Sequence, residues 1–326
     1  MKFDITNEEE GLRVDAFLAK KYQLSRTFVQ RKINESQVTI NEKAAKNSHK
    51  IKSGESIELH HDFFEEPEFD IAQIQPYNTP LDICYEDKDI IIINKQAGLV
   101  VHPGAGNRNN TLVNALVYHF GEQNLSQIDC TRLGIVHRLD KDTSGLMIVA
   151  KNNQAHEFLS NNLKNREGFT RKYLAICYGF PLPASGEIER FMKKGSFEEG
   201  KMKICKEGDK GAKFSKTHYE IKEVLENGLL SIVECKLSTG RTHQIRLHMQ
   251  DIGHGIIGDQ TYKHTGKRHN FTEQIKATIH QANRQLLHAY YIEFIHPTSK
   301  KILKFQAKIP EDMQKFLKNV NSTCKL

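Results

Sequence analysis

From residue 81 onward, strand-like segments follow one another with short connections, and this succession restricts the fold more than any other feature. Seven segments are rich in β-branched and other apolar residues, at residues 90–94, 146–151, 173–178, 218–224, 229–237, 290–295 and 302–307. Helical patterns are fewer, near residues 111–120, 154–164 and 243–252. Because strands joined by short connections pair antiparallel, we expect an α+β domain with a mixed, mainly antiparallel sheet rather than a doubly wound parallel one.

Residues 1–60 have the pattern of a separate small module. Apolar periodicity and alternation predict two helices followed by two strands, at residues 11–22, 25–33, 37–41 and 55–59. Ser25 is suited to cap the second of these helices. We therefore place a domain boundary at residue 60.

Basic residues are concentrated in this module. The whole chain has a formal net charge of +7, and residues 20–52 contain nine basic residues against two acidic ones. The nine are Lys20, Lys21, Arg26, Arg31, Lys32, Lys43, Lys46, Lys50 and Lys52. Such a local excess of positive charge is typical of a phosphate-binding surface, although a solvated face on a structural module has the same composition.

An acidic segment separates the module from the strand-rich region. Residues 61–80 contain no Lys or Arg but five acidic residues, Asp62, Glu65, Glu66, Glu68 and Asp70. Acidic segments that contain proline neither pack well nor bind phosphate. We therefore predict a linker at residues 61–80 and a catalytic domain at residues 81–326.

Cysteine usage and hydropathy exclude several classes of protein. The six cysteines are scattered without a CxxC pair, which favours reduced thiols in a cytoplasmic protein. No apolar run is long enough to cross a membrane, and no Cys and His cluster has zinc spacing, so we expect no metal. Gly104 and Gly106 lack the third glycine of a dinucleotide fingerprint, and we interpret them as part of a turn.

Residues 134–146, GIVHRLDKDTSGL, place an Asp on a polar turn between two apolar segments. A carboxylate beside Arg138 on such a turn is favoured in its ionised form, which suits Asp140 to nucleophilic chemistry. A hydrogen-bonded turn between two strands would need the same residue types. A calcium loop is a third interpretation, but its twelfth position requires a carboxylate and carries Lys151.

Four further segments accompany this turn. They are residues 94–104 (NKQAGLVVHPG), 111–116 (TLVNAL), 240–246 (GRTHQIR) and 284–289 (RQLLHA). Together with HRLD at residues 137–140, and in this order, they resemble the RluA-type pseudouridine synthases over about residues 80–310. The N-terminal module resembles the S4 RNA-binding domain at Arg13, Ser25, Arg26, Val38, Asn41 and Gly54.

The resemblance implies an enzyme that converts uridine to pseudouridine in RNA without a cofactor. This reaction breaks the bond between ribose C1′ and uracil N1 and joins C1′ to C5. The resemblance implies that Asp140 is the nucleophile and that Arg246 pairs with it, which would keep the carboxylate ionised. Tyr173 would stack on the base and is a candidate for the C5 proton step. From the pattern alone, Arg246 would be a surface residue of a helix and Tyr173 a core residue of a strand.

The same resemblance assigns substrate contacts to four more residues, Arg138, Arg241, His243 and Leu287. Arg138 would occupy the space left by a uridine that is flipped out of its stack. Arg241 and His243 would line an RNA cleft, and Leu287 would line the base pocket. His137 would support the conformation of the loop.

Residues 101–107, followed by residues 111–116, resemble one branch of the family, and this resemblance implies clustered uridines in helix 69 of 23S ribosomal RNA as the target. We therefore expect large-subunit rRNA or a pre-ribosome as the partner of a monomeric protein with no membrane or metal partner. Other rRNA or tRNA sites are alternatives, because relatives use the same catalytic residues on them. A ribosome-assembly factor that only binds RNA is a rival from another class. A glycosidase would need a second carboxylate, for which Asp142 is the nearest candidate.

Overall fold

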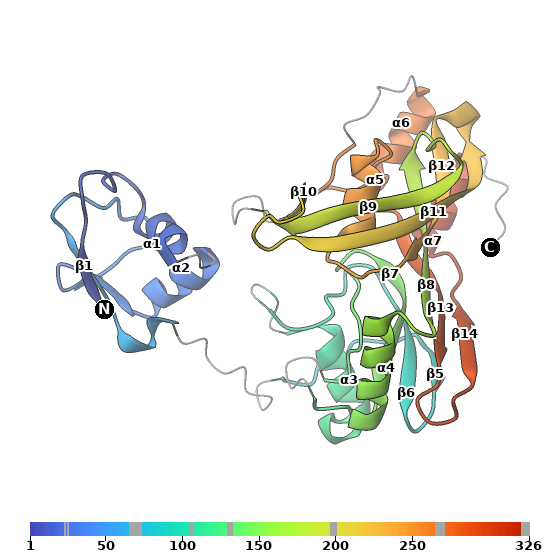
Figure 1. The fold of residues 1–326 in the computed structure, drawn as a ribbon, viewed down its shortest axis with the longest axis horizontal. Coiled ribbons are helices and arrows are strands. Elements are labelled where there is room, and N and C mark those ends of the chain that lie inside the picture. Colours follow the sequence, from blue (N-terminus) through green and yellow to red (C-terminus); the bar gives the residue numbers. More distant parts are fainter. Residues whose placement is uncertain are drawn as a thin grey trace. The chain divides into compact units, whose positions relative to one another are not determined.

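The computed structural model describes residues 1–320 apart from residues 23, 25, 65–73, 105–106, 108, 129–132, 196–200 and 265–270. The chain forms two compact units that divide near Asp70, and Figure 1 labels the elements of each. Some sequence predictions concern residues outside the described ones: Ser25, Glu65, Glu66, Glu68, Asp70, Ala105, Gly106, Cys130 and Cys324.

The described part of the N-terminal unit contains two helices and a small antiparallel sheet. Its elements are β1 (Lys2–Asp4), α1 (Val14–Tyr22), α2 (Arg26–Asn34), β2 (Val38–Ile40), β3 (Lys43–Ala44), β4 (Ser56–Leu59) and the 3₁₀ turn η1 (His61–Phe64). The strands are ordered β1–β4–β2–β3. Apolar side chains from both layers form one core, which includes the fully buried Val14, Leu18 and Phe63. Because Phe63 belongs to this core, the unit extends past the boundary predicted at residue 60.

A buried carboxylate joins the two helices of this unit. Asp15 in α1 accepts hydrogen bonds from the side chains of Arg13, Arg26 and Gln30 at 2.6–3.1 Å. Burial by itself raises the pKa of Asp15, but these three donors hold it well below its ordinary value. Lys32 is also buried and donates to a backbone carbonyl at 2.9 Å. Arg26 and Lys32 therefore support the fold of the unit instead of adding to an exposed basic surface.

A ten-stranded sheet is the frame of the second unit. Its strands are β5 (Ile83–Glu86), β6 (Ile90–Lys95), β7 (Ser144–Ala150), β8 (Phe169–Tyr178), β9 (Ser185–Lys194), β10 (Met202–Cys205), β11 (Lys213–Leu225), β12 (Leu230–Leu237), β13 (Leu287–Ile295) and β14 (Ile302–Gln306). They are ordered β10–β9–β11–β12–β8–β13–β7–β6–β5, and β14 pairs with β13. Among the described residues, each neighbouring pair is antiparallel except β13 with β7. The predicted mixed, mainly antiparallel sheet is confirmed.

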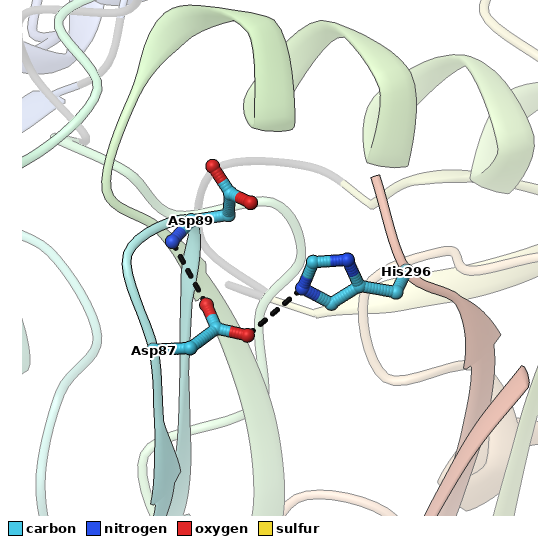
Figure 2. A group of neighbouring side chains, drawn as sticks. All are labelled: Asp87, Asp89 and His296. Atoms are coloured by element: carbon cyan, nitrogen blue, oxygen red, sulfur yellow. Dashed lines mark hydrogen bonds and ion pairs between the residues drawn. The ribbon is translucent and has the colours of Figure 1, made fainter. Parts of the chain in front are cut away.

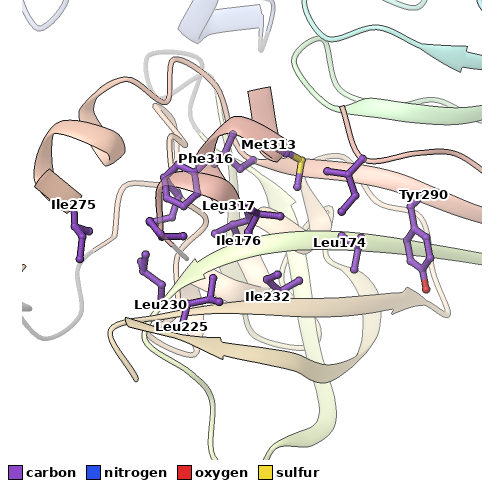
Figure 3. Packing of buried hydrophobic residues seen from close by; sticks show 14 residues of the cluster. Leu174, Ile176, Leu225, Leu230, Ile232, Ile275, Tyr290, Met313, Phe316 and Leu317 are labelled. Carbon is purple, nitrogen blue, oxygen red and sulfur yellow. The ribbon is translucent and has the colours of Figure 1, made fainter. Parts of the chain in front are cut away.

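Helices pack on this sheet, and apolar side chains of the helices and strands together form the core. The helices are α3 (Leu112–Phe120), α4 (Asn153–Asn165), α5 (Gln244–Asp251), α6 (Glu273–His280) and α7 (Glu311–Asn319), with the 3₁₀ turns η3 (Glu122–Asn124) and η4 (Glu226–Gly228). Figure 3 shows one cluster, in which Met313, Phe316 and Leu317 of α7 pack with Leu174 and Ile176 of β8. The sequence analysis did not predict α6 and α7, nor the strands β5, β9 and β10.

Residues 74–80 belong to the second unit, although they form the end of the predicted linker. Ile74 and Thr79 are buried. The side chain of Asn114, which also completes the N-terminal cap of α3, donates to the carbonyl of Gln75 at 2.7 Å. This contact fixes the segment on α3, and composition alone does not reveal it because the partner lies far along the chain.

Candidate active site

The loop that carries Asp140 is held in place by buried hydrogen bonds on both sides. The backbone N–H of Thr143 donates to the carbonyl of Asp140 at 3.1 Å and closes the polar turn. Burial, with a contribution from the charge of Arg171, lowers the pKa of His137 to about 3. The neutral ring of His137 accepts a hydrogen bond through Nε2 from the backbone N–H of Ile148 in β7, at 3.2 Å. His137 therefore supports the loop from the adjoining strand.

Lys95, the last residue of β6, supports the same loop. Its ammonium group donates to the carbonyls of Gln96, Leu99 and Lys141 at 2.8–3.0 Å, and the residue is 1% exposed. Burial lowers the pKa of Lys95 to about 7, against the opposing charge of nearby carboxylates. The three carbonyls accept hydrogen bonds from the charged ammonium group. Through Lys141, Lys95 connects the end of β6 to the loop that carries Asp140.

Arg246, in the first turn of α5, contacts Asp140 directly. Its Nη1 donates to Oδ2 of Asp140 at 3.0 Å, although the two residues are 106 positions apart in the chain. The Asp140 side chain is 18% exposed and the Arg246 side chain 6%. His243 Nε2 lies 4.0 Å from the other carboxylate oxygen, Oδ1. The guanidinium therefore holds the carboxylate through Oδ2, and no described side chain forms a hydrogen bond with Oδ1.

Asp259, which the sequence analysis did not identify, holds the other edge of Arg246. Nε and Nη2 of Arg246 donate to its two oxygens at 2.7 and 2.9 Å. The backbone N–H groups of Thr261 and Tyr262 also donate to Asp259, each at 2.9 Å. Burial alone raises the pKa of Asp259, but Arg246 and these amides hold it below its ordinary value. Burial lowers the pKa of Arg246, but Asp259 and Asp140 together raise it above its ordinary value.

The glycine before Asp259 permits this arrangement. Gly258 has a φ of +78°, and a Cβ at this position would lie 2.0 Å from the carbonyl oxygen of Arg284. Only glycine tolerates that close approach at a positive φ. An acidic residue in a turn has no periodic signal, so pattern analysis has no means of linking Asp259 to Arg246.

His243 is positioned at the start of α5. It is the N-cap of that helix, with a left-handed backbone (φ 56°), and its Nδ1 forms a hydrogen bond with the hydroxyl of Tyr262 at 3.0 Å. Burial lowers the pKa of His243, while the charge of Asp140 opposes this shift. Tyr262 also lies under Arg246, whose guanidinium carbon is 5.2 Å from the ring centroid. One tyrosine therefore orients two neighbours of Asp140.

Asp140 opens onto a cleft of about 490 Å³. The seven predicted site residues all line this cleft: Asp140, Tyr173, Arg246, Arg138, Arg241, His243 and Leu287. They come from the loop before β7, from β8, from the segment that leads into α5, and from the start of β13. The sheet order places β8 and β13 beside each other, which brings these distant segments together.

The walls of the cleft are basic. Among the described lining residues, six are Lys or Arg and Asp140 is the one acid; the six are Arg138, Lys164, Arg166, Arg171, Arg241 and Arg246. Arg246 is balanced by its two carboxylate partners, so five cations face the cleft without an acid in its lining to neutralise them. Such a concave positive surface attracts polyanions. Lys164, at the end of α4, and Arg166 after it were not identified from the sequence.

Tyr173 and Leu287 form the apolar part of the wall. Tyr173 in β8 is 4% exposed and Leu287 at the start of β13 is 3% exposed. Burial raises the pKa of Tyr173 above its ordinary value; Arg171 opposes this shift and Asp140 adds to it. The neutral phenol suits Tyr173 to stacking on an aromatic base and makes it a weak proton acceptor near neutral pH.

Arg138 and Arg241 lie on the exposed part of the cleft. Nη1 of Arg138 is 3.2 Å from Nε2 of His102. Nε of Arg241 donates to the carbonyl of Phe214 at 3.1 Å. A guanidinium has five N–H donors, so Arg241 can form further hydrogen bonds beside the one to Phe214.

A sequence model of the family described as RNA pseudouridylate synthase matches residues 89–251, which contain Asp140, Tyr173 and Arg246. This chain belongs to that family. It is similar to Ribosomal large subunit pseudouridine synthase D of Zymomonas mobilis, with 42% identity over 76% of this chain and 75% of the relative. It is also similar to Uncharacterized RNA pseudouridine synthase YlyB of Bacillus subtilis, 39% identical over 98% of each chain. The RluA-type resemblance and the predicted class of enzyme are confirmed.

Two solved human structures share the fold of this RNA pseudouridine synthase. RNA Pseudouridylate Synthase Domain Containing 4 has a TM-score of 0.56 and 22% identity, over 73% of this chain and 92% of that chain. RNA Pseudouridylate Synthase Domain Containing 1 has a TM-score of 0.52 and 25% identity, over 76% of this chain and 98% of that chain. The pseudouridine synthase fold expected from the sequence is confirmed.

One group of possible metal ligands occurs in the described part of the synthase, and Figure 2 shows its members, Asp87, Asp89 and His296. His296 accepts backbone hydrogen bonds through Nδ1, so Nε2 carries the proton that it donates to Asp87 at 2.8 Å. Asp87 also accepts from the hydroxyl of Tyr85 and from two backbone amides. The carboxylate of Asp89 bonds to neither of the other two side chains and accepts from the side chain of Asn152 at 2.9 Å. None of the three residues lines the cleft. We interpret them as a structural contact that joins two turns of the sheet.

Four cysteines lie in the described part of the synthase, and all are free thiols: Cys84, Cys177, Cys205 and Cys235. Burial raises the pKa of Cys235 to about 12, so this thiol is kept protonated and unreactive. Among the described residues, no helix has the length and apolarity needed to cross a membrane.

Proposed function

We propose that this synthase converts uridines of large-subunit ribosomal RNA to pseudouridine, with Asp140 as the nucleophile. The relative from Zymomonas mobilis, and one from Neisseria meningitidis that is 41% identical over 95% of this chain and 79% of the relative, are both named Ribosomal large subunit pseudouridine synthase D. The resemblance of residues 101–107 to that branch supports the helix 69 stem-loop as the target.

The proposal rests mainly on the surroundings of Asp140. Its carboxylate is bonded to one fixed guanidinium and has one oxygen without a hydrogen bond to another described side chain. It lies in a cleft in which the other charged residues, among those described, are all Lys or Arg. A polyanionic substrate would be attracted to the walls, and its reacting sugar would meet the one carboxylate in the lining.

Each neighbour of Asp140 has a separate proposed role. Arg246 orients the carboxylate through Oδ2, which leaves Oδ1 for the substrate. The bond from C1′ to N1 breaks, the uracil turns, and C5 bonds to C1′; C5 loses its proton and N1 gains one, so the reaction is balanced without a cofactor. Tyr173 stacks on the turning base, and Leu287 forms the apolar floor of the base pocket.

Arg138 is proposed to fill the gap in the RNA stack after the target uridine has flipped out. Arg138 lies two residues before Asp140 in the chain, on an exposed part of the cleft. Its partner His102 comes from another loop. Flipping costs a few kcal/mol in a duplex and less in a loop, which favours a loop uridine such as those of helix 69. Arg241 and His243 are proposed to contact the RNA strand beside it.

The N-terminal unit is proposed to act as an S4-type RNA-binding domain. Of the nine basic residues predicted there, six are exposed: Lys20, Lys21, Lys43, Lys46, Lys50 and Lys52. Lysines on such a surface contact the RNA backbone and add affinity without reading sequence.

The test is carbodiimide-based mapping of pseudouridine in the rRNA and tRNA of a strain that lacks this gene. Specific pseudouridines in large-subunit rRNA are expected to disappear, to return with the wild-type gene, and to stay absent with Asp140→Asn. Binding of rRNA by Asp140→Asn is expected to be retained, because the basic walls are unchanged. Restoration of the pseudouridines by Asp140→Asn would reject Asp140 as the nucleophile, and loss confined to tRNA would reject the rRNA target.

A further inference from the structure

Arg171 is a buried cation for which the proposed mechanism has no role. It lies in β8, two residues before Tyr173, so both side chains point to the same face of the sheet. The intervening Lys172 points to the other face, where its ammonium pairs with Glu234 at 3.0 Å. Arg171 is 9% exposed, and the residue lines the cleft.

Within the described residues, the guanidinium of Arg171 has no hydrogen-bonded or ionic partner. Its one ring contact is with Phe169, whose centroid is 5.8 Å from the guanidinium carbon. The nearby His137 is neutral, because burial and the charge of Arg171 lower its pKa to about 3. Asp140, the one acid among the described residues that line the cleft, is bonded to Arg246. Arg171 therefore carries a positive charge that the folded protein does not balance.

A glycine leaves this guanidinium accessible from the cleft. A Cβ at Gly240 would lie 3.2 Å from both Nη1 and Nη2 of Arg171. Any larger side chain at position 240 would crowd Nη1 and Nη2 of Arg171, the two nitrogens that can bind an anion. Gly240 belongs to the segment that leads into Arg241 and α5, so the open guanidinium lies on the wall where the RNA strand is proposed to pass.

An unbalanced buried charge is costly to the folded state, since burial removes its hydration and no partner replaces it. An unbalanced buried cation is typical of a binding site, where an anionic ligand supplies the compensating negative charge. A guanidinium offers two parallel N–H donors that match the oxygens of a phosphate. A uracil carbonyl could accept one of these hydrogen bonds, but it would not compensate a full positive charge.

We propose that Arg171 binds a backbone phosphate of the RNA strand that enters the cleft, next to the target uridine. This inference rests on the proposed function, because it takes RNA as the occupant of the cleft. Tyr173, on the same face of β8, would meet the base while Arg171 meets the phosphate. The spacing of about 7 Å between alternate residues of a strand fits adjacent parts of one nucleotide.

The test compares Arg171→Gln with Lys236→Gln, which removes an exposed lysine of β12 outside the cleft. An unmodified transcript of the large-subunit rRNA is titrated with each full-length protein over a range of NaCl concentrations. Arg171→Gln is expected to weaken binding about tenfold or more. It should also make the slope of log affinity against log salt shallower by about 0.7–0.9, the value for one lost phosphate contact. Lys236→Gln is expected to leave both quantities close to those of the wild type.

Thermal unfolding distinguishes this role from a structural one. Because Arg171→Gln removes an unbalanced charge, the melting temperature is expected to stay the same or to rise. Unchanged RNA affinity and salt slope would overturn the proposal, as would a fall in kcat alone, which would place the guanidinium on the uracil. The RNA-binding measurement does not depend on catalysis. The effect of Arg171→Gln on affinity can therefore be distinguished from a failure of the wild-type protein to form pseudouridine.

Discussion

At the scale of single residues, the candidate site depends on Asp259 as much as on Arg246. Asp259 engages two nitrogens of Arg246 and leaves Nη1 for Asp140. It is itself fixed by two backbone amides. Arg246 therefore has one orientation in which all of these hydrogen bonds form, and Asp259 is a positioning residue that acts through it.

We expect Asp259→Asn to lower kcat on the order of a hundredfold, because a small displacement of Arg246 disturbs the geometry of Asp140. KM should change much less, since the basic walls remain. Single-turnover assays on an rRNA transcript measure the effect. Asp251→Asn is the matched control: Asp251, the last residue of α5, also pairs with an arginine, but its partner is Arg190, at 2.7 Å, and not Arg246. Equal kcat values for the two variants would contradict the positioning role.

At the scale of elements, the loop with Asp140 is fixed by the strands on either side of it. His137 accepts from β7, and Lys95 at the end of β6 donates to Lys141. The loop itself has few apolar residues, so its conformation depends on these buried polar contacts rather than on packing.

Lys95→Met is expected to destabilise the second unit by about 2–3 kcal/mol, because it leaves the carbonyls of Gln96, Leu99 and Lys141 without their shared donor. Urea unfolding followed by circular dichroism measures the change in the free energy of unfolding. Lys88→Met, an exposed lysine in the turn between β5 and β6, is expected to have an effect within about 0.5 kcal/mol of zero. A stable Lys95→Met protein would show that water replaces the ammonium group.

At the scale of the whole molecule, the second unit buries three histidines in their neutral form. Burial is the main cause in each case: it lowers the pKa of His137 to about 3 and the pKa values of His248 and His288 to about 4. The hydroxyl groups of Ser215 and Ser144 form hydrogen bonds with His248 and His288, at 2.8 and 2.9 Å. These rings take up protons when the chain unfolds.

We expect the free energy of unfolding to fall as the pH decreases from about 6.5 to about 4. In that range the unfolded chain holds protons on these histidines and the folded chain does not, so each contributes a slope of about 1.4 kcal/mol per pH unit. Above about pH 6.5 the slope from these groups vanishes. Urea unfolding at a series of pH values measures it. His288→Asn should reduce the slope, whereas His61→Asn, whose side chain is 89% exposed, should not; a flat profile in the wild type would contradict the prediction.

Many elements of the fold could be predicted because their burial has a local signature. Ile90–Ile93 of β6 and the residues of β7 form continuous apolar runs, which are typical of strands covered on both faces. By contrast, β9 alternates among Glu, Arg and Lys and has few buried positions, so its sequence does not distinguish it from a loop. The contact of Asn114 with Gln75 likewise has no local signal.

The sequence by itself determined the family, the mixed sheet and the seven residues that line one cleft, because motifs and periodicity are properties of neighbouring positions. The resemblance also implied that Arg246 pairs with Asp140, which lies 106 positions away in the chain. Only the tertiary structure decided the rest of this charge network, because Asp259 holds the other edge of Arg246 from a turn that has no sequence pattern. The unbalanced state of Arg171 is likewise visible only in three dimensions, because it depends on which side chains the order of the strands places around it.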